Sequence, residues 1–174
     1  MLVLMTDDER LADPIAAARL LPKGTMIIVR SRDCDRRKAW ANALVALGRT
    51  RQHIVLIAND ADLAMHCGAD GLHLAEANAC QAVHWRALRP QWFISVAAHS
   101  ARVGRLAEFL DAVLLSPVFP TASHPGTSAL LPVRANKMAA AFNTPVYALG
   151  GVTACNAVLL HGFSGIAAIG GLAP

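Results

Sequence analysis

The sequence has few charged residues for its size. Asp, Glu, Lys and Arg make up 16% of the 174 residues, whereas hydrophobic residues make up 55%. This composition excludes an intrinsically disordered chain, which needs many charged and few apolar side chains. It favours a large core, such as that of parallel β-strands buried on both faces.

Cysteine is also scarce. Cys34, Cys67, Cys80 and Cys155 stand far apart and form no C-x-x-C pair. The spacing indicates neither a cysteine zinc site nor a disulfide framework. We expect buried, reduced thiols.

A lysine-rich run and interleaved aromatic residues are absent. The formal net charge is +4, but aromatic residues make up only 5% of the chain. This pattern favours an anionic small molecule as the partner and argues against nucleic acid. The N-terminus lacks the basic region of a signal peptide, and His161 and Ser164 interrupt the apolar tail. We therefore expect no membrane span and a cytoplasmic protein.

Short apolar runs alternate along the chain with segments of helical composition or periodicity. The predicted strands are Leu2–Thr6, Thr25–Arg30, His53–Ala58, Gly71–Leu74, Trp92–Val96, Ala112–Ser116, Pro145–Leu149 and Gly165–Ile169. The predicted helices are Arg10–Leu21, Asp35–Leu47, Asp60–Cys67, Asn78–Leu88, Ala101–Leu110, Leu131–Phe142 and Ala154–His161. Such alternation is typical of right-handed βαβ units.

We therefore predict an α/β protein, a compact TIM (β/α)8 barrel in which residues 1–174 form a single domain. The chain is shorter than the about 250 residues typical of this fold, so we expect the eighth helix to be missing. An open doubly wound sheet is the alternative, but no G-x-G-x-x-G follows the first strand. The apolar flank that a missing helix exposes predicts a homo-oligomer.

Glycine pairs and arginines stand at the predicted carboxyl ends of strands, where TIM barrels carry their function. Gly150-Gly151 and Gly170-Gly171 follow the last two strands and let backbone N–H groups approach a phosphate. Tight turns are the alternative interpretation. Arg30 and Arg32 lie two residues apart, so an extended segment points both the same way, as a fork suited to a diphosphate. A solvated edge is the alternative there.

Asn59 and Asp60 follow the third predicted strand. They can cap the next helix, or they can bind a ligand or magnesium, with Glu76 as the candidate second carboxylate. His73, His99 and His124 also fall at strand ends or loops, but no Ser or Cys stands at a recognisable nucleophile elbow, so no catalytic triad is indicated.

Several segments, in this order, resemble the thiamine phosphate synthase and thiazole tautomerase superfamily over nearly the whole chain. The matching segments are Leu4–Asp7, Val29–Asp33, Ile57–Ala64, Gly68–Leu74, Pro117–Ser123 and Ala148–Val152, with Asn156 beyond the last.

The resemblance implies a (βα)8 barrel that joins an aminopyrimidine diphosphate to a thiazole phosphate and releases diphosphate, with Mg²⁺ as cofactor. It implies that Arg30 and Arg32 meet the diphosphate and that Asp60, next to Asn59, is a magnesium ligand. The residues that it places near thiazole phosphate are Thr121, Ser123, Gly150, Gly151, Ile169 and Gly170.

Some positions differ from the family pattern. Asn78 replaces a second magnesium Asp, Ala97 replaces a serine and His124 replaces a lysine. A neutral Asn binds divalent metal more weakly, so the need for Mg²⁺ is left open. Three functions are open as well. The first is a synthase, in which Arg32 and His124 assist departure of the diphosphate. The second is a thiazole phosphate tautomerase with His99 or His124 as acid or base, and the third is a non-catalytic protein that binds a phosphorylated ligand.

Overall fold

The computed structural model describes residues 1–121 and 128–169. Its strands follow one another in sequence order around a closed parallel barrel. The strands are β1 (Leu2–Met5), β2 (Met26–Val29), β3 (Ile54–Ala58), β4 (Gly71–Leu74), β5 (Phe93–Ala98), β6 (Ala112–Leu115), β7 (Val146–Leu149) and β8 (Gly165–Ala168). The predicted TIM-barrel fold is confirmed, and every predicted strand is present.

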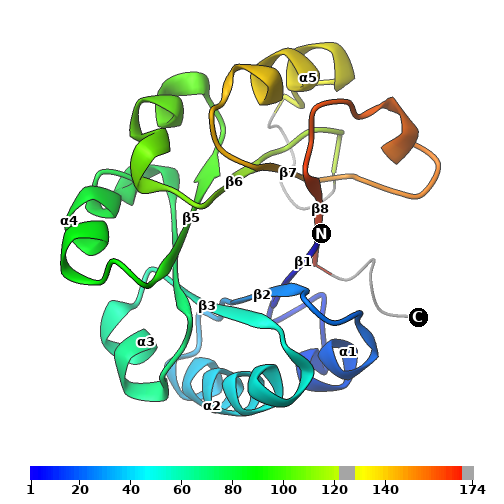
Figure 1. The fold of residues 1–174 in the computed structure, drawn as a ribbon. Helices are drawn as coiled ribbons and strands as arrows, with labels where there is room; N and C mark the ends of the chain where they lie inside the picture. Colours follow the sequence, from blue (N-terminus) through cyan, green and yellow to red (C-terminus); the bar gives the residue numbers. More distant parts are fainter. Residues whose placement is uncertain (122–127, 170–174) are drawn as a thin grey trace. The chain divides into compact units, whose positions relative to one another are not determined.

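Helical segments connect these strands (Figure 1). The α-helices in the described residues are α1 (Pro14–Leu20), α2 (Cys34–Arg51), α3 (Ala61–Cys67), α4 (Gln81–Leu88) and α5 (Pro132–Ala141). The 3-10 helices are η1 (Glu76–Asn78), η2 (Ala101–Phe109) and η3 (Ala157–Leu159). No helix follows β8 before the described residues end at Ile169. No helix in the described ranges is long and apolar enough to cross a membrane.

The chain divides into two compact units, of which the first comprises residues 1–73 and the segment that begins at Ala168. In this unit β1, β2 and β3 pair in parallel, with Leu4 opposite Ile27 and Ile27 opposite Val55. These side chains are at most 1% exposed, because α1, α2 and α3 cover the outside of the strands (Figure 1). Their burial on both faces explains why the strands are continuous apolar runs.

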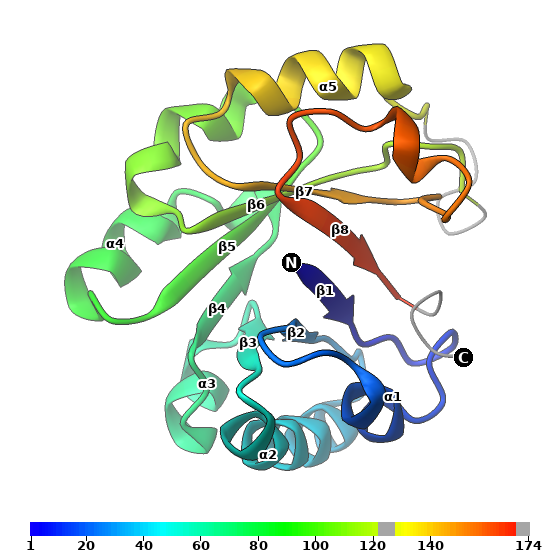
Figure 2. The same cartoon turned by 45° about the vertical axis from the view of Figure 1, so that its right-hand side comes forward.

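The second unit comprises residues 74–167. Its strands β5, β6 and β7 also pair in parallel, with Ala97 opposite Leu114 and Leu114 opposite Tyr147. Helices α4 and α5 both pack against η2, as Figure 2 shows. Parallel pairing brings the carboxyl ends of the strands in each unit to one edge, and the polar residues that follow the strands gather there.

Two helix predictions need correction. Residues 101–109 form a 3-10 helix, and the predicted helix over Ala154–His161 is only the short η3. In this second segment side chains compete with helical hydrogen bonding. The Thr153 N–H donates to Asn156 Oδ1 (2.7 Å), and Asn156 Nδ2 donates to the Gly151 carbonyl (2.9 Å).

The expectation of buried cysteines was wrong. Cys34, Cys80 and Cys155 are exposed, and Cys67 is half-buried. Cys34 begins α2, Cys80 directly precedes α4, and Cys155 lies in the turn before η3. These positions lie at helix starts and turns, where side chains project away from the apolar strands.

Candidate functional site

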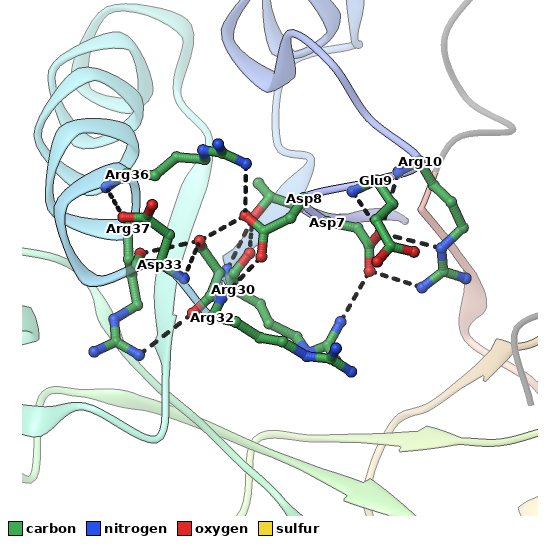
Figure 3. A network of polar contacts seen from close by, with 11 residues as sticks. Asp7, Asp8, Glu9, Arg10, Arg30, Arg32, Asp33, Arg36 and Arg37 are labelled. Carbon is green, nitrogen blue, oxygen red and sulfur yellow. Dashed lines mark hydrogen bonds and ion pairs between the residues drawn. The ribbon is translucent and has the colours of Figure 1, made fainter.

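The first group of polar side chains follows β1 and β2, and we call Asp7, Arg10 and Arg30 the aspartate–arginine cluster (Figure 3). Its backbone is fixed by the fully buried Thr6. Thr6 Oγ1 donates to the Arg30 carbonyl (2.7 Å) and accepts from the Arg30 N–H (2.8 Å). The start of the Arg30 side chain is therefore fixed at the carboxyl end of β2.

The Asp7 carboxylate holds both arginines and is only 7% exposed. Its Oδ2 accepts from Arg10 Nη2 (2.7 Å) and Arg30 Nη1 (3.0 Å). Its Oδ1 accepts from Arg10 Nε (3.1 Å) and from the backbone N–H groups of Glu9 and Arg10 (both 3.2 Å). These contacts, the Arg10 side-chain hydrogen bond above all, hold the pKa of Asp7 well below its usual range. Asp7 is ionised at neutral pH.

Asp8 organises the segment that carries Arg32. It accepts from Ser31 Oγ (2.6 Å), the Arg32 backbone N–H (2.8 Å) and Arg36 Nη1 (3.3 Å). The Ser31 hydrogen bond is the main reason why the pKa of Asp8 is lowered. Arg32 is thus held through its backbone, whereas Arg30 is held through both its backbone and its guanidinium. The two arginines of the predicted fork are therefore held in different ways: Asp7 binds the guanidinium of Arg30, and Asp8 binds the backbone N–H of Arg32.

Asn59 and Asp60 lie where predicted, at the end of β3. Asn59 has a left-handed backbone (φ 51°), and its N–H donates to the His73 carbonyl (2.9 Å). Asp60 is the N-cap of α3, because its Oδ1 accepts from the Leu63 N–H (3.0 Å). Its Oδ2 pairs with Arg37 Nη2 (3.0 Å). The capping role considered from the sequence is present, together with an ion pair that was not predicted.

The donor set around Asp60 does not fit magnesium in this arrangement. Both carboxylate oxygens of Asp60 already have partners, and one partner is the permanently charged Arg37. In residues 1–121 and 128–169, no group of three or more His, Cys, Asp or Glu side chains is arranged to hold a metal ion. A hard divalent cation needs several oxygen ligands, so we route no chemical step through a metal at this carboxylate.

His73 lies in β4 and is 4% exposed. Burial, with a smaller contribution from the Arg30 charge, lowers the pKa of His73 to about 4. The imidazole is therefore neutral at pH 7. Its place near the end of β4 agrees with the strand end predicted from the sequence.

The second group of polar side chains lies in the other unit, after β5 and β6. His99 Nδ1 lies 2.8 Å from the Ser116 carbonyl. Its backbone N–H donates to Glu76 Oε2, and Ser100 Oγ donates to Glu76 Oε1, both at 2.5 Å. Since a carbonyl oxygen only accepts, the proton of a neutral His99 belongs on Nδ1. Nε2 then carries the lone pair and can accept a proton.

Gly150 and Gly151 pack tightly against the segment that follows β6. Both have left-handed backbones, with φ of 93° and 64°. A Cβ on Gly150 would lie 2.9 Å from Pro117 Cα, and one on Gly151 would lie 2.5 Å from the Pro120 carbonyl oxygen. The Phe119 N–H also donates to the Gly150 carbonyl (3.0 Å). Only glycine allows this approach, so the pair sets the course of the segment that leads to Thr121.

The other predicted residues fall in different places. Thr121 is half-buried just after Pro120, Ile169 is half-buried just after β8, and Asn78 ends η1. Ser123, His124 and Gly170 lie outside the described residues. No role was predicted for Arg10 or Arg37 from the sequence. Asp7 and Asp60, which follow β1 and β3, could have indicated that an arginine from elsewhere in the chain pairs with each of them.

A parallel (β/α)8 barrel with charged side chains at its strand ends defines the protein as a TIM-barrel protein. The chain belongs to the thiamine monophosphate synthase family, whose sequence profile matches residues 2–172. The thiamine-phosphate synthase of Chlorobium limicola is 32% identical over 179 residues, which cover 97% of this chain and 83% of that protein. The enzyme of that name from Methanoculleus marisnigri is 34% identical over 169 residues, 87% of this chain and 76% of its own.

Solved structures agree on the fold. The thiamine phosphate pyrophosphorylase of Pyrococcus furiosus superposes with a TM-score of 0.78 at 22% identity, covering 97% of this chain and 84% of that one. At this identity the match supports the fold alone. Together with the family profile, the synthase relatives support a role in thiamine biosynthesis.

Proposed function

We propose that the protein is a thiamine-phosphate synthase, which binds thiazole phosphate and couples it to an aminopyrimidine diphosphate. The observation that carries the proposal is the Arg30 guanidinium, which a buried carboxylate holds 3.0 Å away at the end of β2. A fixed, permanently charged guanidinium suits a diphosphate, because arginine gives bidentate contacts to phosphate oxygens.

The reaction breaks the bond between the pyrimidine methylene carbon and the diphosphate oxygen. The electron pair leaves with the diphosphate, and the lone pair of the thiazole ring nitrogen forms the new carbon–nitrogen bond. Negative charge therefore develops on the departing diphosphate, where arginines stabilise it electrostatically. We assign this task to Arg30 and Arg32, and in the second place to His124.

We assign the thiazole phosphate to strand ends other than that of β2. We also assign Asn59 and His99 to substrate binding. The residues proposed for this phosphate are Thr121, Ser123, Gly150, Gly151, Ile169 and Gly170. Gly150 and Gly151 support the proposal by setting the path of the segment before Thr121. The space that a Cβ would fill at the two glycines is taken by Pro117, Phe119 and Pro120, so the glycines support the proposal through this segment.

A thiazole phosphate tautomerase is the second candidate, and the orientation of His99 favours it. With Nδ1 held by the Ser116 carbonyl, Nε2 can take a proton from a carbon acid and return it elsewhere. This reaction transfers protons only, so it needs no diphosphate.

Incubation of the protein with each substrate set separates the candidates. A synthase forms thiamine phosphate and diphosphate in equal amounts, and Arg30→Ala removes this activity. A tautomerase isomerises the thiazole phosphate alone, and His99→Gln removes that activity while Arg30→Ala does not. Binding of thiamine phosphate in a thermal-shift assay without either reaction would leave the non-catalytic function. An Arg30→Ala variant with the wild-type rate would refute the role of Arg30.

A further inference from the structure

The aspartate–arginine cluster contains two residues, Asp7 and Arg10, to which the proposed function gives no task. Asp7 has less exposed side-chain surface than either arginine. The side chains of Asp7, Arg10 and Arg30 are 10%, 37% and 42% exposed, respectively. The carboxylate thus lies beneath two guanidiniums that reach toward solvent, and both donate to the same oxygen, Oδ2 (Figure 3).

We propose that Asp7 is a positioning residue for Arg30, and that Arg10 keeps the cluster cationic so that it can bind the diphosphate. This inference rests on the proposed function. A single Asp–Arg pair is neutral, and its attraction for an anion is small. Asp7, Arg10 and Arg30 together carry a positive formal charge, which the Glu9 carboxylate beside Arg10 offsets in part, while the shared oxygen fixes the direction of Arg30.

The contacts of Asp7 support positioning over simple neutralisation. Arg10 Nε and Nη2 grip both oxygens of the carboxylate, and two backbone N–H groups hold Oδ1 as well. The carboxylate therefore cannot turn to follow Arg30, and Arg30 must come to it. Thr6 fixes the other end of Arg30 through the backbone. A side chain fixed at both ends loses less conformational entropy when it binds a ligand.

The two roles of Asp7 predict opposite effects of Asp7→Asn on diphosphate binding. If Asp7 only neutralised the arginines, removal of its charge would raise the affinity for inorganic diphosphate. If Asp7 positions Arg30, the affinity falls, by about ten- to a hundredfold for a lost charged hydrogen bond. We expect the fall. Isothermal titration with inorganic diphosphate measures it, and the thermal midpoint of each variant shows whether the fold is retained.

Asp13→Asn is the matched control. Asp13 belongs to the same unit, and its Oδ1 accepts the backbone N–H groups of Ile15 and Ala16 at the start of α1 (3.0 and 2.9 Å). Asparagine caps helices as well as aspartate does, so this variant makes the same change in net charge without touching an arginine. We expect its diphosphate affinity to equal that of the wild type.

A second variant and a double-mutant cycle complete the test. Arg10→Gln leaves a neutral Asp7–Arg30 pair and should weaken diphosphate binding. This variant tests the proposal even if Asp7→Asn does not fold. In an Arg30→Gln background Asp7→Asn should not weaken diphosphate binding further, because the arginine that Asp7 positions is then absent. Unchanged or tighter binding by Asp7→Asn, or full additivity in the cycle, would overturn the inference. Absence of diphosphate binding by the wild type would overturn the proposed function with it.

Discussion

Gly151→Ala tests how strongly the segment after β6 depends on close backbone approach. Gly151 has φ of 64°, and an added Cβ would lie 2.5 Å from the Pro120 carbonyl oxygen and 2.8 Å from Phe119 Cβ. A left-handed Ala costs about 1 kcal/mol. Overpacking against fixed backbone adds about 1–3 kcal/mol. We expect destabilisation by about 2–4 kcal/mol, which lowers the thermal midpoint by roughly 5–15 °C in a chain of this size.

Gly24→Ala is the matched control for this prediction. Gly24 also has a left-handed backbone (φ 77°), but an added Cβ would meet nothing within 4 Å. Its cost is the backbone term alone, about 1 kcal/mol. Thermal and urea unfolding of both variants isolate the cost of the close approach as the difference between them. Equal destabilisation of the two variants would refute the packing role of Gly151.

Three further predictions concern metal, pH and assembly. Magnesium should not increase the thermal stabilisation that diphosphate gives the wild type, because Arg37 already pairs with Asp60 Oδ2. A magnesium response of the wild type would contradict this. The pKa of His73 is lowered to about 4 from 6.5, so between these pH values the unfolded protein binds more protons than the folded one, and the free energy of unfolding should fall as the pH drops from 6.5 to 4. His73→Gln should make the free energy of unfolding, measured by urea titration, depend less on pH. An unchanged pH dependence would exclude His73 as its source. We expect a homo-oligomer, since Val158 and Leu159 on η3 are 73% and 50% exposed; a monomer in light scattering at micromolar concentration would contradict it.

Most of the fold was predictable because the strands carry their own signal. Runs such as Ile54–Ala58 are apolar on both faces, and each predicted strand overlaps an observed one. The segment 154–161 was mispredicted because helix propensity ignores the Thr153–Asn156 hydrogen bonds, which hold the backbone in a turn. Local side-chain to backbone contacts of this kind override composition.

The site was predictable in its residues but not in its pairings. Arg30 and Asp60 could be found from their places after strands. Their partners could not, because Asp7 and Arg30 lie 23 residues apart and only the pairing of β1 with β2 brings them together. The pairing of Arg37 with Asp60 could not be predicted, since the sequence does not show that the start of α2 lies beside the end of β3.

The most direct test of the proposed function is the product balance of the complete reaction. Aminopyrimidine diphosphate and thiazole phosphate are incubated with the wild type and with Arg30→Ala, and thiamine phosphate and diphosphate are quantified together. The proposed function predicts that the wild type forms both products in equal amounts and that Arg30→Ala forms neither above background. Release of diphosphate without thiamine phosphate, or no product from a folded wild type, would contradict it.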